Sequence, residues 1–430
     1  MPQRLDAARP DFEQAFAALL AAKREVSEDV DRAVAAIVAD VVARGDEALV
    51  ELTRKFDRFE IAPETLRVSD GEIETAFRAS DPEALEALRL AAGRIETYHA
   101  RQIPPDHDGT DEAGVRLGWR WTPIQAAGLY VPGGTASYPS SVLMNAIPAK
   151  VAGVERVVMV VPTPDGVLNP LVLAAARIAG VDEVYRIGGA QAVAALAYGT
   201  RTIAPVAKIV GPGNAYVAAA KRRVFGQVGI DMIAGPSEVL ILADGQANPE
   251  WVAADLLAQA EHDAAAQSIL VTDSAELADA VEQAVERQLA TLPRAEIAGA
   301  SWRDFGAVIL VPDLESALPL VDRVAPEHLE IEAEAADLLA ARVRNAGSIF
   351  LGSWTPEAMG DYVAGPNHVL PTARSARFSS GLGVIDFMKR TSFLRCDRRS
   401  LATLGPAAIA LGRAEGLEAH ARSIAIRLGR

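Results

Sequence analysis

The chain has 430 residues, which is more than one ordinary hydrophobic core accommodates, so its length predicts two or more domains. Half of the residues are hydrophobic and 23% are charged, a composition that is typical of a globular protein and excludes a disordered one. The net charge of -15 disfavours a nucleic-acid partner, and the sequence contains neither a signal-like start nor an apolar run that could span a bilayer, so we expect no membrane partner and a cytoplasmic location.

Helical patterns dominate the first hundred residues. Residues 11–45 carry two successive apolar stripes at helical spacing, which predict amphipathic helix. A charged helical stretch follows over residues 70–101 and ends in a loop at Pro104 and Pro105.

The next segment is low in charge and repeats one pattern. Strand-like runs end in glycine or proline turns and lead into alanine-rich helices; these runs start at Gln125, Arg156, Val184 and Ala207. Repeated strand, turn and helix units predict a parallel sheet with right-handed crossover helices.

The same pattern restarts after Ser237 and predicts a second α/β unit. Its expected strands cover 239–242, 268–271, 307–311 and 348–351, and its expected helices cover 249–262, 275–292 and 335–345. The part from about Phe387 onward is basic and then helical. Because it is too small for a core of its own, we expect it to pack on another domain or another subunit.

Four of the six histidines lie close in sequence to a carboxylate or amide side chain: His262, His328, His368 and His420. Neutral imidazole suits zinc, and a neighbouring carboxylate fixes its tautomer, so this pattern is typical of a nitrogen-and-oxygen metal site with an acid/base pair beside it. The other two, His99 and His107, are interpreted as surface residues.

Three glycine turns follow predicted strands: Tyr130-Val-Pro-Gly133-Gly134, Gly188-Gly189-Ala-Gln191 and Gly211-Pro-Gly213-Asn214. Each alone is consistent with a tight turn between strand and helix, and none spells the complete dinucleotide fingerprint. Together they indicate a nucleotide crevice, because backbone N–H groups at such turns face phosphates.

Gln259 and His262 are three residues apart near the end of a predicted helix, so they either share a ligand or form an exposed polar helix end. Asp361 opens a glycine-proline loop that runs to His368 and has no helical or strand rhythm, which favours a functional loop. His420 is either a ligand or an ordinary residue on the face of a terminal helix.

Glu327 and His328 follow Pro326 in a predicted turn, where both side chains either line one cleft as proton acceptors or face solvent. Cys396 is the only cysteine, which excludes an intrachain disulfide and a thiolate metal cage. We interpret it as a packing residue rather than a nucleophile, so acyl chemistry would use water.

The chain resembles the histidinol dehydrogenases almost from end to end. The motifs that carry the resemblance are Tyr130-Val-Pro-Gly-Gly-Thr-Ala-Ser-Tyr-Pro-Ser-Ser-Val, Val210-Gly-Pro-Gly-Asn-Ala-Tyr-Val, Asp231-Met-Ile-Ala-Gly-Pro-Ser-Glu, Gln259-Ala-Glu-His-Asp, Ala325-Pro-Glu-His-Leu-Glu and Gly360-Asp-Tyr-Val-Ala-Gly-Pro-Asn-His-Val-Leu-Pro.

The resemblance implies a role for each candidate residue. One Zn²⁺ per subunit would be held by Gln259, His262, Asp361 and His420. The acid/base residues would be Glu327 and His328, and NAD would contact Tyr130, Gln191 and Asn214. The substrate would be held by Ser237, His328, His368 and Glu415, together with the four metal ligands.

The resemblance also implies an intertwined homodimer with two Rossmann-like parallel-sheet domains and small terminal helical parts. The predicted division is an N-terminal helical arm, 1–25, that packs with the C-terminal part; a first α/β domain, 26–129 and 236–381, with the zinc and catalytic residues; an NAD-binding domain, 130–235; and a C-terminal part, 382–430. That last part would complete the partner's site and place Glu415, His420 and His368 in the other subunit's cleft.

The implied reaction oxidises L-histidinol to L-histidinal and then to L-histidine with two NAD⁺ and water. His328 would remove the alcohol proton and Glu327 would activate water. The alternatives are a zinc- and NAD-dependent dehydrogenase of another small alcohol such as a sulfonated diol, a zinc hydrolase, and a non-catalytic nucleotide-binding module. The presence of Ser237, His368 and Glu415 favours histidinol.

Overall fold

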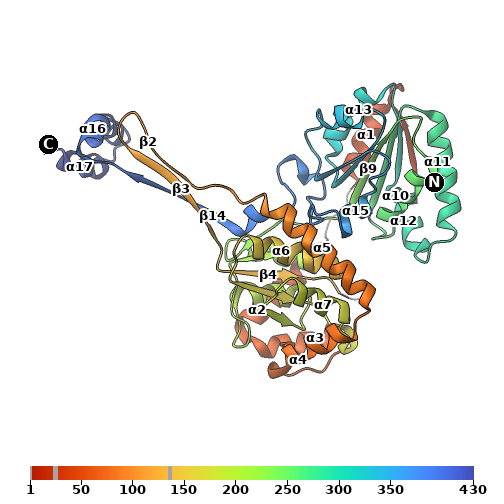
Figure 1. The fold of residues 1–430 in the computed structure, drawn as a ribbon, viewed down its shortest axis with the longest axis horizontal. Coiled ribbons are helices and arrows are strands. Elements are labelled where there is room, and N and C mark those ends of the chain that lie inside the picture. The colour runs from red at the N-terminus through yellow and green to blue at the C-terminus, as the bar shows by residue number, and fades with distance from the viewer. Residues whose placement is uncertain (1, 23–27, 134–137) are drawn as a thin grey trace.

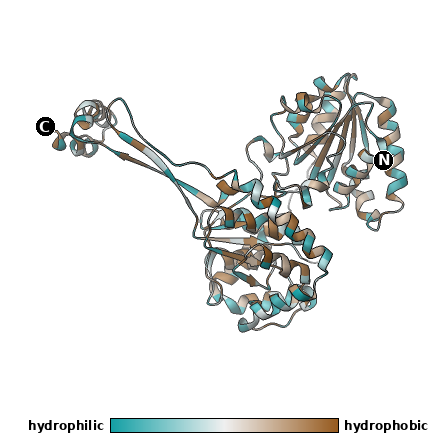
Figure 2. Cartoon of the chain, in the orientation of Figure 1, coloured by the Kyte–Doolittle hydropathy of each residue, from teal (hydrophilic) through white to brown (hydrophobic). Residues whose placement is uncertain are grey.

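The computed structural model describes residues 2–22, 28–133 and 138–430 (Figure 1). In these ranges the strands form two parallel sheets and one antiparallel ribbon, and helices cover both faces of each parallel sheet. The predicted α/β fold with two Rossmann-like sheets is therefore confirmed. Figure 2 shows the apolar strands of both sheets enclosed by helices whose outer turns are hydrophilic.

The first parallel sheet, sheet B, follows the repeated pattern predicted from the middle of the sequence. Within the described residues its strand order is β6-β5-β4-β7-β8, and its strands are β4 (Ala126–Tyr130), β5 (Arg156–Val160), β6 (Glu183–Tyr185), β7 (Lys208–Val210) and β8 (Gly229–Ile230). One face packs against α4 (Asp70–Ala79), α5 (Pro82–Ala100), α6 (Pro139–Val151) and α7 (Pro170–Ile178). The other face packs against α2 (Glu28–Arg44), α3 (Asp46–Asp57), α8 (Gly189–Tyr198) and α9 (Ala215–Val224).

The second parallel sheet, sheet A, repeats this order and adds one strand. The described strands run β1-β11-β10-β9-β12-β13: β1 (Gln3–Asp6), β9 (Glu238–Ala243), β10 (Gln267–Thr272), β11 (Ala307–Leu310), β12 (His328–Glu332) and β13 (Ser348–Leu351). One face packs against α1 (Phe12–Ala21), α13 (Leu314–Val324) and α14 (Ala336–Ala340). The other packs against α10 (Pro249–Ala260), α11 (Ala275–Leu289) and α12 (Ala295–Phe305), and α15 (Glu357–Tyr362) follows β13.

The N-terminal segment packs on sheet A, not on the C-terminal part as predicted. β1 pairs in parallel with β11, with Leu5 opposite Ile309, and Phe16 of α1 is completely buried in the core of sheet A. The sequence analysis missed β1 because its four residues show almost no alternation of apolar and polar side chains. The predicted boundary at residues 25 and 26 lies outside the described residues.

Helices α2 to α5 also pack differently from the prediction, which grouped residues 26–129 with sheet A. Val34, Val41 and Ile95 are buried against sheet B. A parallel sheet needs helices on both faces. The crossover helices of sheet B cover only part of each face, and α2 to α5 cover the rest. The limits of independently folding domains stay a prediction.

A long antiparallel ribbon, which we call the arm, projects away from both sheets (Figure 1). It consists of β2 (His107–Thr110), β3 (Arg116–Pro123) and β14 (Met388–Arg395), and Trp119 pairs with Ser392 across it. At its tip lie α16 (Arg398–Ala414) and α17 (Glu418–Arg427), which bury only a small cluster around Ile409, Ala421 and Ala425. The tip lies beyond both sheets, so the part of the chain described here offers it no other domain to pack on.

Short 3-10 turns complete the described structure: η1 (Pro63–Thr65), η2 (Pro164–Gly166), η3 (Ser375–Arg377) and η4 (Val384–Phe387). No helix in the described ranges is long and apolar enough to cross a membrane. The interpretation of His99 as a surface residue is wrong: its ring is buried, and Nδ1 lies 2.8 Å from the carbonyl oxygen of Ile95. His107 lies on the arm, where it is exposed and packs on Trp119.

Candidate active site

A cavity of about 1050 Å³ lies between the two parallel sheets. On one side it is lined by the loop that follows β7, and on the other by the residues that precede β9 and β12. The carboxyl edge of sheet B therefore faces the amino edge of sheet A. Doubly wound sheets usually bind ligands at their carboxyl edge. The cavity lies at that edge of sheet B, whereas sheet A contributes its amino edge to it.

The glycine turn after β7 is shaped by close backbone contacts. Gly211 has φ +108°, and a Cβ there would lie 2.2 Å from the carbonyl oxygen of Tyr130. Asn214 then caps α9, since its Oδ1 accepts hydrogen bonds from the backbone N–H groups of Tyr216 (3.1 Å) and Val217 (3.2 Å). The exposed helix N-terminus that results lines the cavity and is suited to an anionic group.

The other predicted cofactor residues lie at the same edge of sheet B but do not line the cavity. The buried Tyr130 hydroxyl accepts a hydrogen bond from the N–H of Gly189 at 3.0 Å, and burial raises the Tyr130 pKa to about 12. Gln191 is buried in the first turn of α8. Gly134, which closes the predicted turn after Tyr130, lies outside the described residues.

The Pro326-Glu327-His328 segment enters the cavity through a strained turn. Helix α13 ends at Val324, and the residue that caps it, Ala325, has a φ of +48°, which is rare for a residue other than glycine and recurs at functional sites. The Glu327 carboxylate accepts a hydrogen bond from the N–H of Glu238 at 3.0 Å and lies near Ser237. Burial raises the pKa of Glu327 well above its usual value.

His328 is the first residue of β12 and is buried. Its Nδ1 lies 3.0 Å from the carbonyl oxygen of Glu238, so we assign the ring proton to Nδ1. Nε2 then carries the lone pair, and it has no hydrogen-bond partner in the described part of the chain. Burial lowers the pKa of His328 to about 4, so the ring is neutral at physiological pH and can accept a proton at Nε2.

Gln259 and His262 reach this region because α10 returns from the carboxyl edge of sheet A to its amino edge. Gln259 is in the last turn of α10 and fully buried, with its amide 3.2 Å from Nδ1 of His328. The helix ends at Ala260, earlier than predicted, so His262 lies in the turn beyond it, where it is exposed and lines the cavity. The structure thus brings Gln259, His262 and His328 together.

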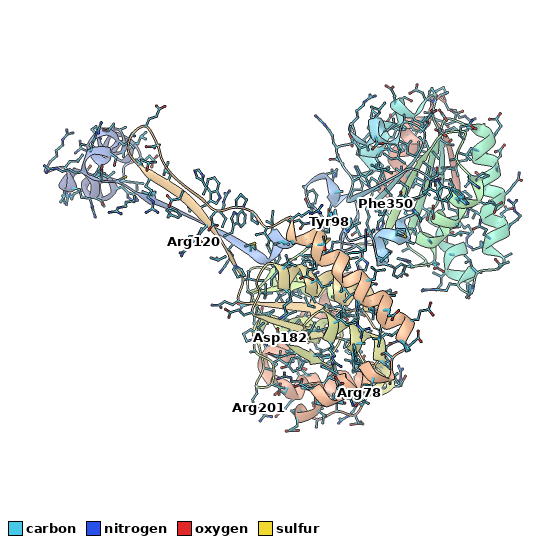
Figure 3. The ribbon with its side chains drawn as sticks, viewed as in Figure 1. Arg78, Tyr98, Arg120, Asp182, Arg201 and Phe350 are labelled. Carbon is cyan, nitrogen blue, oxygen red and sulfur yellow. The ribbon has the colours of Figure 1, made fainter. Side chains whose placement is uncertain are left out.

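Asp361 is held close to His328 by the packing of α15. A Cβ at Gly360 would lie 2.6 Å from the ring of Phe350, so only glycine lets the helix approach β13 this closely. The Phe350 ring, labelled in Figure 3, lies 6.0 Å from the ring of His328. Asp361 Oδ1 lies 3.9 Å from Nε2 of His328.

Glu357 is a site residue that the sequence analysis missed. It is buried, its Oε1 lies 3.6 Å from Nδ1 of His328, and burial raises its pKa well above the usual value. Ligand atoms of His328, Glu357 and Asp361 lie within 4.8 Å of one another. The spacing of four residues between Glu357 and Asp361 would have identified it, because such residues share one helix face.

His368 lines the cavity formed by its own chain, so its expected place in the partner's cleft is wrong. Its Nδ1 lies 3.0 Å from the carbonyl oxygen of Asp361 and its Nε2 lies 3.3 Å from the Ser141 hydroxyl. The loop from Asp361 folds back over its own helix, which the sequence pattern did not reveal. Ser141, at the start of α6, was also missed.

Glu415 and His420 do not join this cavity. Both are exposed at the tip of the arm, at the end of α16 and the start of α17, and the cavity of the same chain has no contribution from α16 or α17. Of the four predicted metal ligands, the structure brings together Gln259, His262 and Asp361 and leaves His420 apart.

A second group of carboxylates lies farther along β12. Glu330 and Glu332 alternate with the core side chains and point to the same face as His328, toward Asp255 on α10, and oxygens of these three carboxylates lie within 4.8 Å of one another. Burial raises the pKa of Asp255 to about 6 and that of Glu332 to about 7. Glu330 accepts a hydrogen bond from the N–H of Glu357 at 2.6 Å.

Comparison with known proteins gives one consistent result. The family model described as histidinol dehydrogenase matches residues 20–428. The histidinol dehydrogenase of Bradyrhizobium diazoefficiens is 69% identical over 428 residues, covering 100% of this chain and 99% of the relative, and that of Rhodopseudomonas palustris is 68% identical with the same coverage. The crystal structure of histidinol dehydrogenase from Elizabethkingia anophelis is similar with a TM-score of 0.95 at 36% identity, covering 100% of this chain and 98% of that one.

Proposed function

Because this chain belongs to the histidinol dehydrogenase family, we propose that it oxidises L-histidinol to L-histidine through L-histidinal, with two NAD⁺ and one water. This reaction would supply the last two steps of L-histidine biosynthesis. The identity of more than two thirds to named histidinol dehydrogenases over the full chain favours histidinol over another small alcohol. The cytoplasmic location predicted from the sequence stays a prediction.

One observation carries the mechanism: the buried Nε2 of His328, which no other described residue hydrogen-bonds, lies at a cavity that also contains Glu327 and the capped loop ending at Asn214. The hydrogen bond from Nδ1 to the Glu238 carbonyl fixes the tautomer in which Nε2 accepts a proton. His328 therefore removes the proton from the substrate hydroxyl.

Glu327 is suited to the second half of the reaction. Its raised pKa makes it a stronger base than an ordinary glutamate once it has lost its proton, so it can take a proton from the water that hydrates the aldehyde. Two fixed groups, the N–H of Glu238 and the side chain of Ser237, orient its carboxylate. No cysteine lies in the described lining of the cavity, which agrees with the use of water rather than a thiol.

The residues of the cavity fit a zinc ion. Asp361 offers a carboxylate that forms no ion pair with a lysine or arginine among the described residues, while Gln259 and His262 add an amide oxygen and an imidazole, the donor types that zinc accepts. We infer that these three residues hold one Zn²⁺ with His420 as the fourth ligand. When bound, zinc orients the nitrogen atoms of the substrate.

NAD⁺ would bind along the carboxyl edge of sheet B, close to Tyr130, Gln191 and Asn214. Supporting this are the exposed N-terminus of α9 and the loop from Gly211 to Asn214, both of which line the cavity and are suited to an anionic group such as a pyrophosphate. When bound, NAD⁺ would supply the hydride acceptor for both oxidations. Ser237, His368 and Glu415 would hold the substrate for that transfer.

The exposed position of Glu415 and His420 supports a homodimer with shared sites. The tip that carries them exposes large apolar side chains, among them Leu394, Leu411 and Ile426, and buries little of its own. A tip of this kind needs a partner surface. We infer that the tip of each subunit covers the cavity of the other and completes its metal and substrate sites.

The decisive experiment is an NADH assay with purified, zinc-loaded protein, NAD⁺ and L-histidinol. We expect two NADH for each L-histidinol consumed, with L-histidine as the product identified by mass spectrometry. One NADH per substrate would indicate a simple alcohol dehydrogenase. No NADH with histidinol, but turnover with a sulfonated diol, would assign the chain to the alternative substrate.

A further inference from the structure

An ion pair with almost no solvent exposure lies in the wall of the cavity, next to the loop that we assign to the cofactor. Lys221 of α9 and Asp231, the residue after β8, form an ion pair in which each side chain is 2% exposed. Burying two charges has a large desolvation penalty that their mutual attraction must offset, and a pair of apolar side chains of similar volume often stabilises a core equally well. Stability alone therefore does not explain why an ion pair occupies this position.

The pair holds both polar backbone atoms of one residue, Gly211. The N–H of Gly211 donates to Asp231 Oδ2 at 2.8 Å, and Lys221 Nζ donates to the carbonyl oxygen of Gly211 at 3.0 Å. Gly211 has no side chain, and its φ of +108° is unfavourable for any other residue. Because Gly211 has no side chain that could hold it in place, the two side chains of the ion pair fix the loop through its backbone.

The same pair anchors the segment that crosses from sheet B to sheet A. The second oxygen of Asp231 accepts a hydrogen bond from the N–H of Met232 at 2.6 Å. From there the chain passes Gly235, whose N–H donates to Thr372 Oγ1 at 2.6 Å, and reaches Ser237 beside Glu327. One buried contact therefore joins the loop leading to Asn214 with the segment that carries Ser237 into the cavity.

We propose that Lys221 and Asp231 are positioning residues that hold the Gly211–Asn214 loop in its binding conformation and so set the affinity for NAD⁺. The identity of the ligand, NAD⁺, rests on the proposed function. The effect of the ion pair on the loop does not depend on it. Neither residue touches the reacting atoms. Their loss should weaken NAD⁺ binding while the base His328, on the other sheet, keeps its own contacts.

The test compares a double variant with the wild type as zinc-loaded full-length proteins. Lys221→Met with Asp231→Asn removes both charges, keeps an oxygen for the N–H of Gly211, and leaves its carbonyl oxygen without a donor. We expect a melting temperature close to that of the wild type, a Kd for NAD⁺ raised about tenfold because a charge-assisted hydrogen bond is lost, a KM for histidinol changed little, and a kcat at saturating NAD⁺ largely retained.

Hydrogen–deuterium exchange of the segment 209–217 provides a readout that needs no ligand. Exchange there should be faster in the double variant than in the wild type. The matched control is Arg156→Met with Glu183→Gln, which removes another ion pair of sheet B, at the amino end of β5, away from the cavity. The control should leave both the Kd for NAD⁺ and the exchange of 209–217 unchanged.

The possible outcomes distinguish a failure of the positioning role of Lys221 and Asp231 from a failure of the proposed function. Wild-type affinity and wild-type exchange in the double variant overturn the positioning role, and so does an equal loss of affinity in the control pair. Should the double variant not fold, Lys221→Gln with Asp231→Asn, which also removes both charges but leaves a hydrogen-bonding amide at each position, is judged by the same two measurements. If the wild type itself gives no NADH with histidinol, the proposed function fails, and the exchange result still decides whether the ion pair holds the loop.

Discussion

Glu332→Gln should stabilise this protein at alkaline pH and have little effect at acidic pH. Glu332 is 3% exposed, belongs to the carboxylate group with Asp255 and Glu330, and has a pKa raised to about 7 by burial. In the unfolded chain the same carboxyl group ionises near its usual value of 4.5. The folded state therefore retains a proton that the unfolded state releases, and stability falls as the pH rises from about 4.5 to about 7.

The size of the effect follows from the difference between the two pKa values. About 2.5 pH units correspond to about 3 kcal/mol of unfolding free energy above pH 7. Because Asp255 lies close enough to share the titration, and a buried amide also needs hydrogen-bond partners, we expect a gain of about 1–3 kcal/mol for Glu332→Gln. For a domain of this size that is a rise of roughly 2–4 °C in melting temperature per kcal/mol.

The assay is thermal unfolding of the wild type and the variant at pH 4.5, 6, 7 and 8.5. Glu334→Gln is the matched control, since it removes the same charge from an exposed position two residues away. The difference between Glu332→Gln and wild type should be near zero at pH 4.5 and reach its maximum above pH 7, while the control stays flat. A variant that is less stable than the wild type at pH 8.5 would refute the reasoning, because the ionised carboxylate would then make a favourable contact.

Three further predictions concern the site. His328→Asn should lower kcat by about 10²–10⁴-fold, the usual contribution of a general base, while calorimetric titration shows a Kd for NAD⁺ within about twofold of the wild type; a larger change in Kd would mean that His328 also shapes the cofactor site. Glu327→Gln and His420→Ala chains should each be inactive, but after unfolding and refolding together they should recover about a quarter of the wild-type activity, since half of the dimers are hybrids with one intact site; no recovery in verified hybrids would place each site within one chain. Chelation should abolish NADH formation while circular dichroism stays nearly unchanged, and added Zn²⁺ should restore turnover; full activity in metal-free protein, checked by elemental analysis, would contradict the metal site.

Much of the fold was predictable because sheet B and most of sheet A are built from a repeated pattern. The run from Val157 to Val161 is entirely apolar, ends in a proline turn and leads to a helix, which is the sequence pattern of a buried parallel strand. β12 was missed because its buried residues alternate between apolar and acidic, and buried glutamates such as Glu330 contradict the usual pattern of a central strand. The arm was missed because its strands are largely exposed and lack an apolar face.

The candidate site was predictable in its residue types but not in its arrangement. The sequence alone identified Gln259, His262, His328 and Asp361 as candidate site residues. In the structure His262, His328 and Asp361 line the cavity, and the buried amide of Gln259 contacts His328. That meeting depends on the amino edge of sheet A facing sheet B, a tertiary relation that no local pattern encodes. His368 was assigned to the wrong subunit for the same reason, whereas Glu357 was overlooked although its spacing of four residues from Asp361 on α15 is a local signal.

The arm sets a length as well as a direction. β3 and β14 pair residue for residue from Arg116 opposite Arg395 to Pro123 opposite Met388, so eight residue pairs separate its base from its tip, or about 27 Å of strand. Removing one residue from a single strand would turn the following side chains to the opposite face, whereas removing two from each strand would shorten the span by about 7 Å and keep every face. The arm therefore sets the distance between its base and its tip. Changes in its length should occur only as matched changes in β3 and β14, two segments more than 250 residues apart in the sequence.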